Sequence, residues 1–133
     1  MIKELVTYIS TEASLTIGTD IHAGWFPQDE LTTGTAVMEF GGAPQVLTGT
    51  GRGQAMFEIY TRGATYHTAR DAAMAIYEVL RIKGKVVLPT ITSGDTVYVV
   101  EQMIPEGRPQ HIGEDEKRRH EFTFTLHCYI KEA

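Results

Sequence analysis

The stretch "HEFTFTLHCYI", residues 120–130, decides the fold class of this chain. Its even-numbered positions from Phe122 to Ile130 are all apolar, whereas the positions between them, from Glu121 to Tyr129, carry polar groups. Consecutive side chains of a β-strand point to opposite faces of the sheet, so this alternation predicts a strand with one buried face. We expect the opposite, polar face to be solvated or to meet another subunit.

Other strands are expected upstream of this one. Residues 20–26, "DIHAGWF", are short and extended and stop at Pro27. Residues 35–40, "TAVMEF", and residues 54–63, "QAMFEIYTRG", are rich in β-formers. A further strand is expected from 96 to 104, after the turn signal "SGD".

Two segments show the period of an amphipathic helix instead. Near the N-terminus, Ile2, Leu5, Val6 and Ile9 fall at i, i+3, i+4 and i+7, and Gly18 is a possible end of the segment. Residues 65–84, "TYHTARDAAMAIYEVLRIKG", begin at a candidate N-cap, Thr65, and end at Gly84, a candidate left-handed C-cap. The alanines of this second helix permit a close approach to a sheet.

These elements predict a single domain over residues 1–133 of the α+β class. The expected order is helix, strand, strand, strand, helix, strand, strand. We expect a mostly antiparallel sheet of four to five strands with both helices packed on one face.

Composition excludes several classes of protein. The chain has 133 residues, is 42% hydrophobic and carries a net charge of −5, so it lacks the basic balance of a duplex-binding domain. One cysteine, Cys128, rules out an internal disulfide and a four-cysteine zinc site. No apolar run approaches the roughly 20 residues of a membrane-spanning helix, and Lys3 and Glu4 interrupt any signal-peptide pattern. We expect a protein made in the cytoplasm, with no membrane partner.

The glycine-rich segment "FGGAPQVLTGTGRGQAMFEIY", residues 40–60, is the strongest candidate for a nucleotide site. It lacks the lysine of a Walker loop, and a strand follows it where a dinucleotide fingerprint requires a helix. We interpret it as a long connection between two strands that becomes ordered on a partner.

The remaining candidates for chemistry are equally weak. The five histidines form no metal-binding spacing, and Cys128 lies on the apolar face of its strand, as a buried, inert thiol would. The run "GEDEKRRHE", residues 113–121, nearly neutralises itself and reads as a solvated hairpin tip or as a salt-bridging surface for a neighbour. We therefore expect no catalytic residue, no metal and no cofactor; a small enzyme without a recognisable motif, for instance around Asp20 and His22, is an unfavoured alternative.

Three motifs carry a resemblance to a known family. They are "EFGGAP" at 39–44, the helix entry Y-x-x-A-R-D-x-A at 66–73, and "IGEDEKRRHEF" at 112–122. Together with the order of elements they resemble the minor capsid or tail terminator proteins of long-tailed bacteriophages and prophages, over nearly the whole chain. None of these motifs is catalytic, so the resemblance bears on fold and role.

The resemblance implies a structural virion protein of the tail or neck that forms a ring, commonly of six subunits. Such a ring caps the head-proximal end of the tail tube, stops tube polymerisation and offers a head–tail joining surface. The implied partners are further copies of the chain, the tail tube protein and a head completion or neck protein. Genome DNA would be only passing cargo, which the acidic balance suits. The alternative within the same class is a head completion or neck connector protein that seals the portal.

Two segments are the expected ring and tube contacts. In the glycine-rich segment they are Gly42, Gly49, Gly51, Arg52 and Gly53; in the hairpin tip they are Glu114, Asp115, Glu116, Lys117, Arg118 and Arg119.

Overall fold

The computed structural model describes residues 1–24, 33–40, 52–81, 84–91 and 97–132. Its elements in chain order are α1 (Ile2–Ala13), β1 (Ile21–Ala23), β2 (Gly34–Phe40), β3 (Arg52–Gly63), α2 (Tyr66–Leu80), β4 (Val86–Val87), β5 (Tyr98–Pro105), β6 (Gln110–Glu114) and β7 (His120–Glu132). The predicted α+β class with two helices is thereby confirmed.

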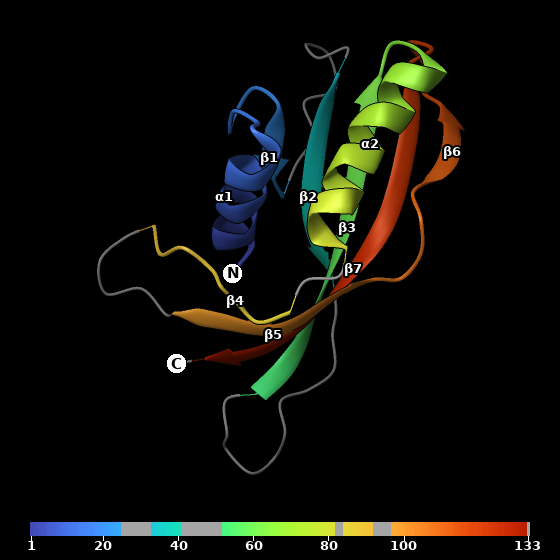
Figure 1. The fold of residues 1–133 in the computed structure, drawn as a ribbon. Helices are drawn as coiled ribbons and strands as arrows, with labels where there is room; N and C mark the ends of the chain where they lie inside the picture. The colour runs from blue at the N-terminus through green and yellow to red at the C-terminus, as the bar shows by residue number, and fades with distance from the viewer. Residues whose placement is uncertain (25–32, 41–51, 82–83, 92–96, 133) are drawn as a thin grey trace.

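The described strands form one sheet in the order β1-β2-β3-β7-β5-β4, with β6 also paired to β7. β3 and β7 are the longest strands, at 12 and 13 residues, and they pair antiparallel along their length, with Phe57 opposite Leu126. The first part of β7 pairs with β6 and the second part with β5. Both helices lie on one face of this sheet, side by side, with α1 near β1 and β2 and α2 over β3 and β7 (Figure 1).

The core lies between this face and the helices. Its alternation on β7 is as the sequence predicts, because Phe122, Phe124, Leu126 and Cys128 are all buried. α1 contributes Leu5, Val6 and Ile9, α2 contributes Ile76 and Leu80, and β3 contributes Phe57 and Ile59. Each fully buried large apolar side chain stabilises the fold by about 1.5–3 kcal/mol relative to an exposed one.

The structure corrects the predicted sheet. In the described residues it has seven strands instead of four to five, and it is mixed, because β1 runs parallel to β2, instead of mostly antiparallel. The prediction was wrong because β4 and β6 are short and mostly exposed. Without a buried face, such strands leave no apolar alternation in the sequence.

Both predicted helix ends differ from the observed ones. α1 ends at Ala13, five residues before the expected end at Gly18, and Ser14 adopts a left-handed conformation there. Gly18 (φ +87°) instead turns the chain into β1, and its N–H donates to the Ile21 carbonyl at 2.9 Å. α2 ends at Leu80, with Arg81 extended, so Gly84 is not its cap.

The start of α2 agrees with the prediction. The Thr65 hydroxyl accepts a hydrogen bond from the Thr68 N–H at 3.1 Å, as an N-cap does. Gly63, the last residue of β3, lies so near the helix that an added Cβ would be 2.6 Å from the Ala69 nitrogen. Ala69 and Ala73 are fully buried against Phe122. Small residues therefore fix the close packing of α2 on the sheet.

Candidate functional site

The turn between β6 and β7 is built around the carboxylate of Asp115. Its Oδ1 accepts the backbone N–H groups of Lys117 at 2.9 Å and Arg119 at 2.8 Å, and its Oδ2 accepts Arg119 Nε at 2.6 Å. The backbone also closes on itself, from Asp115 N–H to the Arg119 carbonyl at 2.9 Å. Arg118 takes a left-handed conformation, with φ of 60°. The predicted hairpin tip is thus a tightly organised turn.

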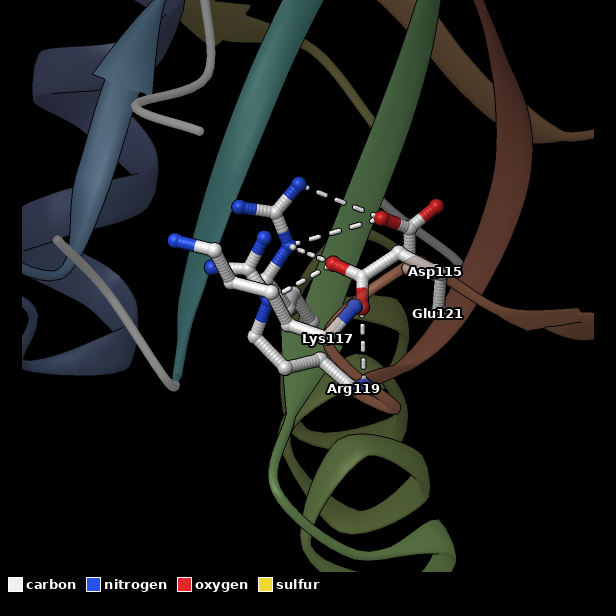
Figure 2. Close-up of polar contacts among 5 residues, drawn as sticks. Asp115, Lys117, Arg119 and Glu121 are labelled. Atoms are coloured by element: carbon white, nitrogen blue, oxygen red, sulfur yellow. Dashed lines mark hydrogen bonds and ion pairs between the residues drawn. The ribbon is translucent and has the colours of Figure 1, made fainter. Parts of the chain in front are cut away.

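An arginine from β3 joins this turn to the sheet. Arg62 Nη2 lies 3.2 Å from Glu121 Oε1, and Arg62 Nε lies 3.7 Å from Asp115 Oδ2. Figure 2 shows Asp115, Arg119 and Glu121 gathered over β3, with their charged ends turned toward one another. Arg62 is only 2% exposed and Arg119 only 6%. We call Arg62, Asp115, Arg119 and Glu121 the arginine–acid cluster.

The cluster favours the ionised form of the Asp115 carboxylate. Desolvation tends to raise the pKa of Asp115, but hydrogen bonds from the backbone and side chain of Arg119 and from the backbone of Lys117 hold that pKa below its usual value. Buried guanidinium groups need such partners, because an unpaired buried charge is strongly unfavourable. Asp115 and Arg119 therefore hold the turn together. Their expected role as ring or tube contacts stays a prediction.

The other tip residues face solvent. Glu114, Glu116, Lys117 and Arg118 are exposed. They display two acidic and two basic side chains on a turn whose backbone Asp115 holds in place. This is a prearranged polar surface, and it remains available for a partner.

Only part of the glycine-rich segment can be placed. Gly42, Gly49 and Gly51 lie outside the described residues. Arg52 and Gly53 begin β3, opposite Lys131 and Ile130 of β7. The segment is thus followed by a strand, as expected, and not by the helix whose N-terminus would bind a phosphate in a dinucleotide fingerprint.

The outer face of the sheet, opposite the helices, carries polar cross-strand contacts. Glu58 on β3 accepts the hydroxyl of Thr123 at 2.6 Å and that of Thr125 at 3.0 Å, both from β7. Burial, and then the charges of Glu58 and Glu121, raise the pKa of Tyr60 on the same face. A pocket of about 370 Å³ opens beside Glu58 and Arg108. Half-buried polar groups thus cover the face that the sequence marks as solvated or as an interface.

A second series of polar side-chain contacts crosses the same face. Gln54 Nε2 donates to His127 Nδ1 at 2.8 Å, and His127 Nε2 lies 3.3 Å from Glu106 Oε2. An amide nitrogen can only donate, so Nδ1 accepts and the ring proton sits on Nε2, toward the carboxylate. His127 is thereby fixed in one orientation as part of the sheet surface.

Two more histidines meet where β6 joins β7. His111 Nε2 lies 3.2 Å from His120 Nδ1 with the rings stacked, and His120 Nε2 lies 3.3 Å from Glu114 Oε1. Tyr66, at the start of α2, packs edge-on against both rings. The group is aromatic and partly exposed.

The described residues include neither a metal-binding cluster nor a reactive thiol. They contain no group of three or more His, Cys, Asp or Glu side chains able to hold a metal ion. Cys128 is buried, and desolvation raises its pKa to about 12, so the thiol is protonated at neutral pH. No helix of this part of the chain is long and apolar enough to span a membrane.

Sequence reasoning missed Arg62, Glu58 and Glu121 as organisers of the surface. Strand parity places Glu58 and Glu121 on outward faces, and this was the one available signal. Which residues face one another depends on the register between β3 and β7, which sets Arg62 against Glu121. That register follows from packing and not from local sequence.

Comparison with known proteins decides the family. The model of the bacteriophage tail terminator protein family matches residues 8–131, nearly the whole chain. This chain belongs to the bacteriophage tail terminator family. The resemblance drawn from the three sequence motifs is therefore confirmed, and the protein is a structural component of a phage-type virion tail.

A solved structure shares the fold. It is a chain from the "Virion of native gene transfer agent (GTA) particle", with a TM-score of 0.56 and 16% sequence identity. The match covers 98% of this terminator-family chain and 94% of that chain. A comparison with curated protein sequences gave no match.

Proposed function

We propose that this chain assembles into a ring, commonly of six subunits, that caps the head-proximal end of the tail tube. The ring ends tube polymerisation and presents the surface to which the head is joined. The observation that carries this proposal is the tail terminator match over residues 8–131. The protein acts by contact and not by catalysis, inside the neck of the virion, after synthesis in the host cytoplasm.

The exposed tip is our first candidate for a partner contact. Glu114, Glu116, Lys117 and Arg118 project from a turn that Asp115 already fixes. A surface that is ordered before binding loses little conformational entropy on binding, so even modest charged contacts contribute to affinity. Opposite charges in such a patch also select orientation and partner.

The segment from Gly42 to Gly53 is the second candidate. It leads directly into β3, the strand whose outer face carries Glu58 and Tyr60. We propose that it contacts the tube protein, with Arg52 as its charged member. The head completion protein would meet the opposite side of the ring, and DNA would pass through without binding, because a net charge of −5 disfavours phosphate contacts.

Deletion of the gene tests the proposal. Electron microscopy of lysates from the parent phage should show overlong or irregular tubes detached from filled heads. Tails of normal length beside heads that have leaked DNA would instead assign the protein to the head side of the joint. That outcome would support a head completion role and overturn the terminator proposal.

Complementation then tests the tip. A variant with Glu114→Gln, Glu116→Gln, Lys117→Gln and Arg118→Asn removes two acidic and two basic groups, and asparagine tolerates the left-handed backbone at 118. The matched control, Arg70→Gln, Asp71→Asn, Glu78→Gln and Arg81→Gln, removes two acidic and two basic groups from α2 and from the residue that follows it. We expect the control to restore tail length and the tip variant to restore it less. Equal rescue would exclude the tip as a contact.

A further inference from the structure

An open apolar groove lies at the β1 end of the sheet. It has a volume of about 400 Å³, and Val6 of α1, Ile17, Ile21, Ala23 and Ile91 line it, with Lys3 as its charged member. Ile17 and Ile91 are each 51% exposed. Large aliphatic side chains that remain half in water beside a groove are typical of surfaces that bind another protein.

An apolar projection lies at the opposite end of the sheet. Ile112 of β6 is 50% exposed and sits at a break in the pairing register, between His111 and Gly113. Among the described strands β6 pairs with β7 alone, so its second edge has no strand beside it there. Tyr66 at the start of α2 is also 41% exposed. A bulge of this kind redirects a side chain and interrupts regular edge pairing.

The two surfaces carry opposite charges at one point each. The groove carries Lys3, whereas β6 ends at the exposed Glu114, which lies 3.3 Å from His120. Glu116 follows, and the basic Lys117 and Arg118 lie further along the turn. Figure 1 places α1 and β1 at one side of the molecule and β6 at the other, so the groove and the projection cannot meet within one chain. Two different surfaces at opposite ends of one subunit are what a head-to-tail contact requires.

We propose that the β6 edge of one copy, centred on Ile112, docks in the groove of a second copy beside Ile17 and Ile91. Lys3 of the receiving copy then faces Glu114, the last residue of β6. Repetition of this contact closes into a ring or extends into a filament, depending on the rotation between copies. The inference rests on the proposed ring for its biological meaning, but the contact itself is testable alone.

Cysteine cross-linking tests the contact. The pair Ile17→Cys with Ile112→Cys places one new thiol on each surface, and the native Cys128 is too deeply buried to interfere. Mild oxidation of the concentrated protein, and of particles from the complemented deletion strain, should give a ladder of linked species. Either single variant should stop at the dimer. The pair Ile17→Cys with Ile104→Cys, which moves one thiol to another exposed isoleucine on β5, should give no ladder.

A mixing experiment tests the head-to-tail geometry. Ile17→Asp blocks the groove and Ile112→Asp blocks the projection, and both positions are exposed enough for folding to survive, as circular dichroism would verify. Each variant alone should be monomeric in native mass spectrometry, and their mixture should form heterodimers and nothing larger.

Two results would overturn the contact. One is absence of the ladder in both the protein and the particles; the other is assembly of either aspartate variant like wild type. These failures are separable from failure of the proposed function. A ladder together with normal tails in the deletion strain would keep the contact and reject the terminator role. Overlong tails without a ladder would do the reverse.

Discussion

The two faces of the β3–β7 pair are held by different forces. Toward the helices, Phe57, Ile59 and Leu126 are fully buried among aliphatic and aromatic neighbours. On the outer face, Glu58 binds two threonine hydroxyls, and Arg62 reaches the carboxylates of Asp115 and Glu121. One pairing of β3 with β7 thus gives the sheet an apolar inner face and a hydrogen-bonded outer face.

The difference teaches which part of the molecule is robust and which is specific. Hydrophobic burial is non-directional and scales with area, so the inner face needs only apolar side chains of suitable volume. Polar contacts depend on distance and angle and fail when the register shifts. We infer that the inner face sets stability, whereas the outer face and the tip set the shape that a partner meets.

The largest expected effect is on the inner face. Phe57→Ala removes a fully buried ring and should lower the free energy of unfolding by about 3–5 kcal/mol. Met56→Ala, one residue along the strand on the outer face, is the matched control and should cost clearly less. Urea denaturation of both variants gives the comparison. Equal losses would mean that the two faces do not differ as described.

The next effect is in the arginine–acid cluster. Arg62→Met keeps the aliphatic stem but leaves Asp115 and Glu121 without their shared cation, and should cost about 2–3 kcal/mol. Arg70→Met, on the exposed side of α2, should cost less than about 0.5 kcal/mol. Thermal unfolding at low and at high salt distinguishes them. If Arg62→Met left the free energy of unfolding unchanged, the cluster would not be what holds the tip.

A smaller effect is expected at Glu58. Thr125→Val removes one hydroxyl donor while it keeps the shape of the side chain, and should cost about 1 kcal/mol. In the double variant with Glu58→Gln, the loss in free energy of unfolding should differ from the sum of the two single-variant losses, because the two residues share a hydrogen bond. Strictly additive losses in this double-mutant cycle would contradict a hydrogen bond between Thr125 and Glu58.

An effect of similar size depends on pH. The pKa of Asp115 is lower in the folded protein than its ordinary value, so its stabilising contribution is present above the unfolded pKa of about 3.9. That contribution is lost as the pH falls through the folded pKa. Asp115→Asn should therefore be less stable than wild type at pH 6, by an amount on the order of 1 kcal/mol. The gap should narrow below about pH 4, and a constant gap would contradict the assignment.

How far the sequence predicts the structure follows the same division. The alternation of residues 120–130 predicts β7, and the N-cap at Thr65 predicts the start of α2. Both signals lie within one short segment, and both elements bury one face against the core. β6 lacks an apolar alternation and could not be found in this way. The charges of residues 114–119 balance locally, so the sequence predicts a tip that neutralises itself. The cation that joins the tip to the sheet, Arg62, comes from β3. Contacts of that kind depend on the tertiary fold.

The most direct test of the account is to see where the protein binds. Overlong tubes from the deletion lysate, incubated with purified protein and labelled by immunogold, should carry label at one end of each tube and should no longer accept tube protein there. Label along the tube wall, at both ends alike, or on the portal of tailless heads would contradict a terminator that caps the head-proximal end.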